Sequence, residues 1–557
     1  MKPTYLKKFT TLFLLCALVS CKKQLEENPQ SILTPQYFST AQGLQSGLDA
    51  AYAGNRQLWG SENLLTMTEP GTDEFISGNG GNTDINRYSS NFDSSSGWVS
   101  GIWNVCYAYI NDCNGIIDNS AGVTGIDPAT LKLKVGEAKF LRANYYFLLV
   151  RFWGDVTLNQ HFISQPTTSA TRSPIADVYN FIISDLTDAI AALPVSPVQN
   201  GVLPGKATAA AARHLLTKVY LTRAYSSAKK PDDFQNAFNT AKSLIDNSTS
   251  LGLGLLPDFA SVYAEGNEAN KEVLWSVQHT SNLAYNANGD NGLGNGDNSL
   301  LFFYVMGYEN FPGLSRSIAY GRPFARVMPT RWLTDTAYRD KSNDSRYFKT
   351  FQALWLSNDV NKIPKVNGVP KYTLGDTAVY MPGVDVSDAK IAATRYLLVP
   401  PRKYNLQLFP TMLKYQDTKR IGINNVSIRP IIVYRLAETY LMAAEAAFNL
   451  GNSTDAAKYI NAVRERAAYP NGNAAAMDIT PSNVTLDFIL DEDARELCGE
   501  QFRWLDLVRT GKLVERVRLH NTDGSINIKP YHVLRPIPQS QIDRTIAGPK
   551  YPQNPGY

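Results

Sequence analysis

The chain has 557 residues, 44% of them hydrophobic and 19% charged, and a formal net charge of +4. This composition is ordinary for a globular protein, and the length allows more than one domain. Residues 1–20 carry three lysines and no acid, so removing them would lower the formal charge from +4 to +1. Phosphate binding needs an excess of Lys and Arg, and we therefore expect no nucleic-acid partner.

The N-terminus has the pattern of a bacterial lipoprotein signal. Lysines precede an apolar run at 9–19, which is shorter than the ~20 residues of a membrane-spanning helix. A basic start, a short apolar stretch and small residues are typical of a secretory signal. Leu-Val-Ser-Cys at 18–21 resembles a lipobox. We predict a signal peptide over 1–20 and a lipid on Cys21; the alternative is an ordinary signal with an incidental cysteine.

Helical patterns and a long loop follow along the chain. Thr34-Pro35 indicates a helix start, and an apolar stripe continues to Tyr52. Residues 60–97 are rich in Gly, Asn, Ser and Asp, which predicts a long loop, and long loops in compact folds are often functional. Helical spacing of apolar residues returns at 98–119 and 131–153.

The chain after residue 153 changes character twice. Ser173-Pro174 indicates another helix start, and residues 208–247 predict an antiparallel helix pair. Residues 251–430 have short apolar runs with many Gly and Pro, typical of loops, short strands and small helices. Strong helical patterns resume at 431 and continue to about 518, and the Pro-rich end of the chain predicts an extended, packed tail.

Helix pairs of tetratricopeptide type recur in this pattern. The segment "YLMAAEAAFNLGNSTDAAKYINAVRER" places Ala444 where two helices touch and Gly451 at the turn between them. The 208–247 pair is similar. Residues 98–153 and 486–518 are candidates for degenerate copies.

Cysteines do not indicate a disulfide framework. Cys106 and Cys113 fall on one predicted helix, about 10.5 Å apart along its axis, which is too far for a disulfide. We expect these two and Cys498 to be small buried apolar residues.

Several motifs together resemble the SusD/RagB family of Bacteroidetes nutrient-binding lipoproteins. The stretch "GIWNVCYAYINDCNGIID" resembles a helix motif with Trp103, Tyr107, Ile110 and Asn114. The segment "FILDEDARELCGEQFRWLDLVRTGKL" and the ending "LRPIPQSQID…QNPGY" resemble the family's C-terminal signature. The resemblance covers essentially the whole chain after the signal.

The resemblance implies a fold, a partner and a location. It implies a mainly α, superhelical SusD-like scaffold of tetratricopeptide-like helix pairs, with a loop-rich inserted ligand-binding region and little β structure. We expect residues 21–250 and 251–557 to form one compact unit. It also implies a protein lipid-anchored in the outer membrane, facing the extracellular side, that binds glycans and pairs with a SusC-like TonB-dependent transporter.

Charged residues alternate in sign along the C-terminal signature. An ion-pair lattice on packed helices explains this pattern better than a catalytic carboxylate pair, because the acids are interleaved with arginines. The residues concerned are Asp493, Arg495, Glu496, Glu500, Arg503, Asp506 and Arg509.

No zinc, phosphate-loop or serine-hydrolase motif occurs, and we expect no cofactor. One loop, "NANGDNGLGNGD", partly follows calcium-loop spacing with Asn286, Asn288, Asp290 and Asp297. Asn291 stands where that loop requires Gly, so a polar binding loop is the preferred interpretation.

Aromatic and polar side chains on the loop-rich segments are the candidates for glycan contact. Flat rings stack on the apolar face of a sugar while polar groups bind its hydroxyls; large apolar residues are nevertheless more often buried. The candidates are Asp73, Arg87, Trp98, Tyr285, Tyr304, Tyr308 and Tyr320.

We therefore predict a non-enzymatic glycan-binding protein that delivers its ligand to a transporter. One alternative is a glycoside hydrolase that uses an Asp/Glu pair. Others are a tetratricopeptide adaptor for protein partners only, and a binder of a non-glycan nutrient, since fold does not determine ligand.

Overall fold

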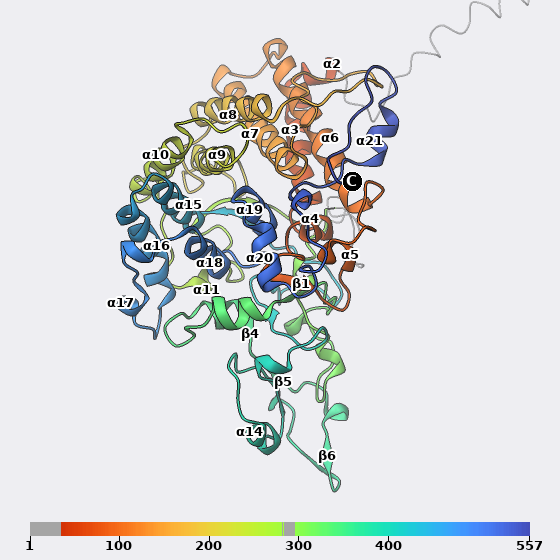
Figure 1. The fold of residues 1–557 in the computed structure, drawn as a ribbon. Coiled ribbons are helices and arrows are strands. Elements are labelled where there is room, and N and C mark those ends of the chain that lie inside the picture. The colour runs from red at the N-terminus through yellow and green to blue at the C-terminus, as the bar shows by residue number, and fades with distance from the viewer. Residues whose placement is uncertain (1–34, 281, 283–295) are drawn as a thin grey trace, which may run out of the picture.

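A computed structural model describes residues 35–280, 282 and 296–557. Figure 1 shows most of the helices gathered in one large body, from which the segment with β5, β6 and α14 projects. Within the described residues, no helix combines the length and the apolarity that crossing a membrane requires. Predicted Cys21 and its signal peptide lie outside these residues.

The helical frame is built from successive antiparallel neighbours, as the repeat pattern predicted. Each helix packs on the one before it (Figure 1). Helix α15 packs on α10, although residues 247–435, which we call the insert, separate the two helices in the chain. The frame helices are α3 (Ala41–Gly54), α6 (Gly97–Asn119), α7 (Pro128–Trp153), α8 (Ile175–Ala192), α9 (Ala209–Ala224), α10 (Asp233–Asp246), α15 (Leu436–Asn449), α16 (Ser453–Ala467) and α18 (Leu486–Glu496).

Local sequence sets where these helices begin and end. The side chains of Thr40 and Asp127 cap α3 and α7 by accepting backbone N–H groups in the first turn. Gly154, with φ of +71°, ends α7. Ala444 is fully buried where α15 meets α16, and Gly451, with φ of +77°, makes the turn between them.

The segment 60–97 is not the long loop that its composition predicted. It forms α4 (Glu62–Thr68), β1 (Phe75–Ser77) and α5 (Thr83–Arg87), and much of it is buried. Ser61 and Asn82 act as N-caps for the two helices, which is the reason that polar residues occur at their starts. The prediction was wrong because cap residues were interpreted as loop residues.

Strands are short and mostly paired in twos. The β2–β11 pair joins the insert to the frame, with Ile431 opposite Val277, so residues 431–435 are a strand and not the helix start predicted. The antiparallel pairs are β1 with β3 (Val327–Pro329), β2 (Val273–Val277) with β11 (Ile431–Arg435), β4 (Phe351–Gln352) with β10 (Thr411–Met412), β5 (Leu354–Leu356) with β8 (Thr377–Tyr380), and β6 (Lys365–Val366) with β7 (Val369–Pro370); β9 (Leu397–Leu398) joins β8 in parallel.

Short helices complete the described chain. The α-helices are α2 (Pro35–Phe38), α11 (Phe259–Val262), α12 (Leu300–Phe303), α13 (Arg346–Thr350), α14 (Asp388–Ala393), α17 (Ala474–Met477), α19 (Arg503–Arg509), α20 (Leu513–His520) and α21 (Gln539–Arg544). The 3-10 helices are η1 (Asn55–Gln57), η2 (Ser120–Gly122), η3 (Tyr308–Asn310), η4 (Ile318–Tyr320), η6 (Val360–Lys362), η7 (Pro401–Lys403), η8 (Pro481–Asn483) and η9 (Pro530–Val533), and η5 (Trp332–Ala337) is a π-helix.

The main hydrophobic core contains residues from both halves of the chain. Trp504 stacks on Phe152 with ring centroids 5.6 Å apart, which joins α19 to α7. The three cysteines of the described chain are buried and unpaired, as expected. The Pro-rich tail packs against the end of α7, where the indole N–H of Trp153 donates to the carbonyl of Pro536 at 2.8 Å. The predicted packing of the tail is confirmed, but residues 539–544 form a helix, α21, and are not extended.

Buried ion pairs form a lattice that includes six of the seven predicted residues; Asp493 makes no ion pair within the described residues. Arg435 reaches Glu272 and Glu500 at 3.2 and 2.9 Å and Glu496 at 2.6 Å. All four side chains are buried. A hydrolase would need free carboxylates among the acids of the C-terminal signature. Glu496 and Glu500 are two of these acids, and both pair with arginine.

Candidate functional site

Asp73, the first predicted ligand contact, lies inside the protein. Its carboxylate accepts hydrogen bonds from Arg503 at 2.7 and 2.6 Å and from Arg516 at 2.5 Å. These guanidinium groups overcome the effect of burial and hold the pKa of Asp73 well below its usual range. The expectation of an accessible side chain is wrong, because Asp73 ties β1 to α19 and α20.

Tyr304 and Tyr308 are also buried, so the expectation that they are accessible is wrong. The hydroxyl of Tyr304 donates to the carbonyl of Gly499 at 2.9 Å, and its ring stacks on Tyr415. The hydroxyl of Tyr308 donates to the carbonyl of Gly321 at 2.7 Å. The ring of Tyr304 belongs to the main core, and the ring of Tyr308 belongs to a smaller core formed by residues 305–409. The Gly-rich neighbourhood gave no sign of this burial in the sequence.

The remaining predicted contacts stay predictions. Arg87 is exposed on α5, whereas Trp98 on α6 and Tyr320 on η4 are half-buried. The hydroxyl of Tyr320 is engaged with the backbone of Leu356. No described hollow brings these three side chains together.

The predicted binding and calcium loop lies mostly outside the described residues. Tyr285, Asn286, Asn288 and Asp290 fall there, and Asp297, which is described, is buried. Across the described ranges, no three His, Cys, Asp or Glu side chains are placed to hold a metal ion together. The calcium interpretation is therefore still a prediction.

A hollow of about 600 Å³ opens between α3, the loop before α9 and the end of β2. We call it the α3–β2 hollow. Thr280 lines it, and Gly296 lies close to Arg56. Residues on both sides of the segment 281–295 therefore border this site. Its lining residues are Asp49, Ala50, Tyr52, Ala53, Asn55, Arg56, Pro204, Gly205, Lys206, Trp275, Ser276, Val277, Gln278 and Thr280.

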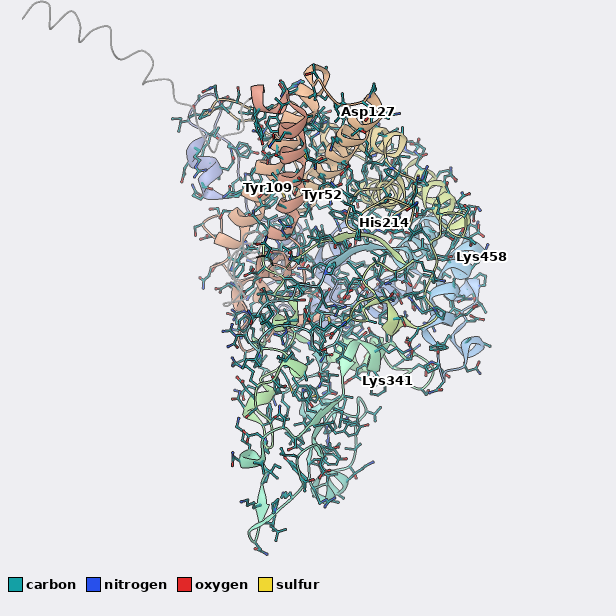
Figure 2. All side chains as sticks on the ribbon, turned by 180° about the vertical axis from the view of Figure 1, so that it is seen from behind. Tyr52, Tyr109, Asp127, His214, Lys341 and Lys458 are labelled. Carbon is teal, nitrogen blue, oxygen red and sulfur yellow. The ribbon has the colours of Figure 1, made fainter. Side chains whose placement is uncertain are left out.

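Three local features shape this hollow. Residues 49, 50, 52 and 53 share one face of α3, because positions three and four apart lie on the same side of a helix. Gly54 lets Tyr109 of α6 pack directly on α3, since a Cβ there would lie 2.2 Å from the ring. Figure 2 shows Tyr52 and Tyr109 on this part of the molecule. Gly205, with φ of +81°, turns the loop beside Gln278.

Tyr52 is the accessible ring of the hollow. Its hydroxyl oxygen accepts the N–H of Ala207 at 2.9 Å, and the Nζ of Lys206 lies 4.4 Å from the ring centroid. Burial and the nearby Glu137 carboxylate raise the pKa of Tyr52 well above its usual range, so the hydroxyl keeps its proton. Trp275 is only 2% exposed and donates its indole N–H to Gly205, so it forms a wall of the site.

Polar groups converge on this ring. Lys206 pairs with Glu137 at 3.1 Å. Gln278 and Arg56 are half-buried, and Asp49 is exposed at the rim. A concave site with apolar walls and a few directed polar groups can bind a small polar molecule and fix its orientation.

Sequence reasoning missed this site for a physical reason. Tyr52 continues the apolar stripe of α3 and therefore resembles a core residue. The other lining residues come from segments that are far apart in the chain, and no local pattern predicts that they meet. The one available signal was the polar tip of Tyr52 on an otherwise aliphatic stripe.

A second hollow, of about 510 Å³, lies between α6 and the C-terminal tail, and we call it the α6–tail hollow. Its lining is mostly neutral amides and hydroxyls, and Trp103 at its base is buried. Asn104 and Arg544 are exposed in it, and their side chains make no hydrogen bond or ion pair with the described residues. Substitutions in the α6–tail hollow therefore serve as controls for substitutions in the α3–β2 hollow.

The fold and the two hollows define a helical-repeat protein with concave surfaces on its described part. Comparison with known proteins gives the family. The SusD family model matches residues 271–557, and a second model, described as starch-binding associating with outer membrane, matches residues 23–221. The chain belongs to the SusD family, and the predicted mainly α SusD-like fold is confirmed.

Similar proteins cover almost the full chain. SusD-like protein P2 of Formosa agariphila is 28% identical, with 99% of each chain covered. Starch-binding protein SusD of Bacteroides thetaiotaomicron is 23% identical over the full length of both. Among solved structures, a laminarin binding SusD-like protein is 25% identical, with a TM-score of 0.65 and 93% of this chain and 100% of that chain covered. A SusD homolog from B. thetaiotaomicron has a TM-score of 0.73 at 23% identity, with 96% and 100% covered.

Proposed function

We propose that this protein is a cell-surface glycan-binding protein and that the α3–β2 hollow holds its oligosaccharide. The observation that carries the proposal is an accessible tyrosine ring in a concave site with several side-chain hydrogen-bonding groups. Relatives described as starch-binding and laminarin binding support the ligand class.

The dimensions of the hollow suit a short oligosaccharide. Its volume of about 600 Å³ lies within the range of small-molecule sites, roughly 300–1,000 Å³. The ring of Tyr52 offers an apolar surface for the C–H face of a sugar. Lys206 and Gln278 supply donors and an acceptor for its hydroxyls.

Anchoring and delivery are the second part of the proposal. A lipid on Cys21 would attach the mature protein to the outer membrane, from which it passes glycans to a SusC-like TonB-dependent transporter without cleaving them. The lipobox and the family description that mentions the outer membrane support this location. The pairing of Glu496 and Glu500 with arginine supports binding without catalysis.

Calorimetric titration with starch and laminarin oligosaccharides tests the site. We expect Tyr52→Ala to weaken binding about fivefold or more, because the apolar contact of a sugar with the ring contributes ~1 kcal/mol or more. Tyr52→Phe keeps the ring and should retain most of the affinity. Asn104→Ala, in the α6–tail hollow, should bind as the wild type does.

Three results would count against the proposal. Equal binding by Tyr52→Ala with a native circular dichroism spectrum would exclude the α3–β2 hollow. Loss of binding in Asn104→Ala alone would move the site to the α6–tail hollow. New reducing ends during incubation would show catalysis.

A further inference from the structure

We infer that the α3–β2 hollow selects an anionic saccharide, one that carries a carboxylate or a sulfate ester, and that Arg56 binds the anionic group. This inference rests on the proposed function, since it names the ligand class of the same site. It goes beyond that function because a neutral glycan would not require Arg56.

The charges that line the hollow favour an anion. Arg56 and Lys206 are its two cations, and Asp49 is its one acid among the described residues. Asp49 is exposed at the rim and accepts a hydrogen bond from the Nε2 of Gln45 at 2.7 Å. It therefore points its charge to solvent and to its own helix.

Arg56 contrasts with two buried arginines of the frame helices that have carboxylate partners. Arg142 makes two hydrogen bonds of 2.8 Å to Asp185, and Arg223 pairs with Asp233. Arg56 makes no ion pair with any residue in 35–280, 282 or 296–557, although it is half-buried. Burial without a counter-charge disfavours the charged form and lowers the pKa of Arg56.

Lys206 cannot take the same role. Its Nζ lies 3.1 Å from the carboxylate of Glu137 and also contacts the ring of Tyr52. Its charge is therefore already compensated inside the hollow. Within the described residues, Arg56 is therefore the cation of the hollow that has no counter-charge.

The guanidinium geometry sets the chemistry of that partner. A planar guanidinium offers parallel N–H donors that match the two oxygens of a carboxylate or a sulfate ester. With Tyr52 in the same hollow, a sugar ring can lie on the tyrosine while its anionic substituent pairs with Arg56. Desolvation of Arg56 in the free protein makes the gain from this pairing larger.

Matched ligands test the inference by calorimetry. Oligogalacturonides are compared with their methyl esters, and sulfated carrageenan oligosaccharides with their desulfated forms, so that the sugar backbone is kept and the negative charge is removed. We expect the anionic member of at least one pair to bind about tenfold more tightly. Raising the salt from about 50 to about 300 mM should reduce that preference.

Variants assign the preference to one residue. Arg56→Gln should remove most of the preference for the anion, so that binding of the anionic member weakens about tenfold more than binding of the neutral member. Arg56→Lys keeps the positive charge but loses the planar guanidinium, and should retain only part of the preference for the anionic ligand. Arg544→Gln, in the α6–tail hollow, removes an exposed arginine elsewhere and should have no effect.

The outcomes separate this inference from the proposed function. If neutral oligosaccharides bind as tightly as anionic ones and Tyr52→Ala abolishes binding while Arg56→Gln does not, the inference fails and the proposed function stands. If Arg544→Gln and not Arg56→Gln removes the preference, the anion site lies in the other hollow. If neither neutral nor anionic oligosaccharides bind, both fail.

Discussion

The pKa of Glu69, in the 60–97 segment, depends on its burial and on the charges around it. It is fully buried and makes no ion pair with any described residue, whereas Asp73 four residues later has two arginines. Burial and the neighbouring Glu74 carboxylate raise the pKa of Glu69 well above its ordinary 4.5. The folded protein therefore holds a proton on Glu69 that the unfolded chain releases.

Stability should consequently fall as the pH rises above the ordinary value for glutamate. Near pH 4.5 and below, Glu69 is protonated in both states; above it, only the folded state keeps the proton, which favours unfolding. Glu69→Gln removes the titrating group and with it this loss of stability at high pH. We therefore expect the free energy of unfolding of the variant, minus that of the wild type, to be larger at about pH 8.5 than at about pH 5. Urea denaturation at both values measures the difference.

An exposed glutamate is the control for this pH effect. Glu515 is largely exposed on α20, and Glu515→Gln should shift stability equally at the two pH values. If Glu69→Gln and Glu515→Gln show the same pH dependence, the carboxyl of Glu69 is not protonated in the folded protein and this interpretation is wrong.

Arg435 connects several elements at the junction of β11 and α15. It contacts Glu272, which precedes β2, together with Glu496 of α18 and Glu500. We expect Arg435→Met to reduce the free energy of unfolding by about 3–5 kcal/mol, because it leaves buried carboxylates without a partner. Chemical denaturation followed by circular dichroism measures the loss.

A surface ion pair gives the comparison. Arg331 pairs with Asp335 one turn later, and its side chain is 49% exposed. Arg331→Met should change stability by less than about 1 kcal/mol, since solvent screens such pairs. A loss for Arg435→Met no larger than that for Arg331→Met would show that the buried lattice does not stabilise the fold.

Elements could be predicted from sequence where local signals agreed. The frame helices show a clear apolar periodicity, and Gly154 and Gly451 mark their ends, so the predicted helices match the structure closely. The segment 60–97 failed because N-cap residues such as Ser61 also occur in loops. The strand β11 was missed because five buried residues directly before a helix show no distinguishing period.

At the scale of the whole molecule, sequence predicted the family but not the binding surface. The C-terminal signature indicated the SusD fold. In the structure, the residues of this signature form buried ion pairs and aromatic contacts in the core. Asp73, Tyr304 and Tyr308 were assigned to a ligand surface because polar, Gly-rich neighbours suggest exposure, yet each has its partners inside the protein. The α3–β2 hollow combines residues 49–56, 204–206 and 275–280, which only the folded chain brings together.

The glycan-binding role of the α3–β2 hollow is the central claim, and a crystal structure of the protein with a bound oligosaccharide tests it most directly. We expect density for a sugar ring against the ring of Tyr52, with an anionic substituent at Arg56 when the ligand carries one. Density confined to the α6–tail hollow, or to the surface near Arg87 and Trp98, would contradict the claim.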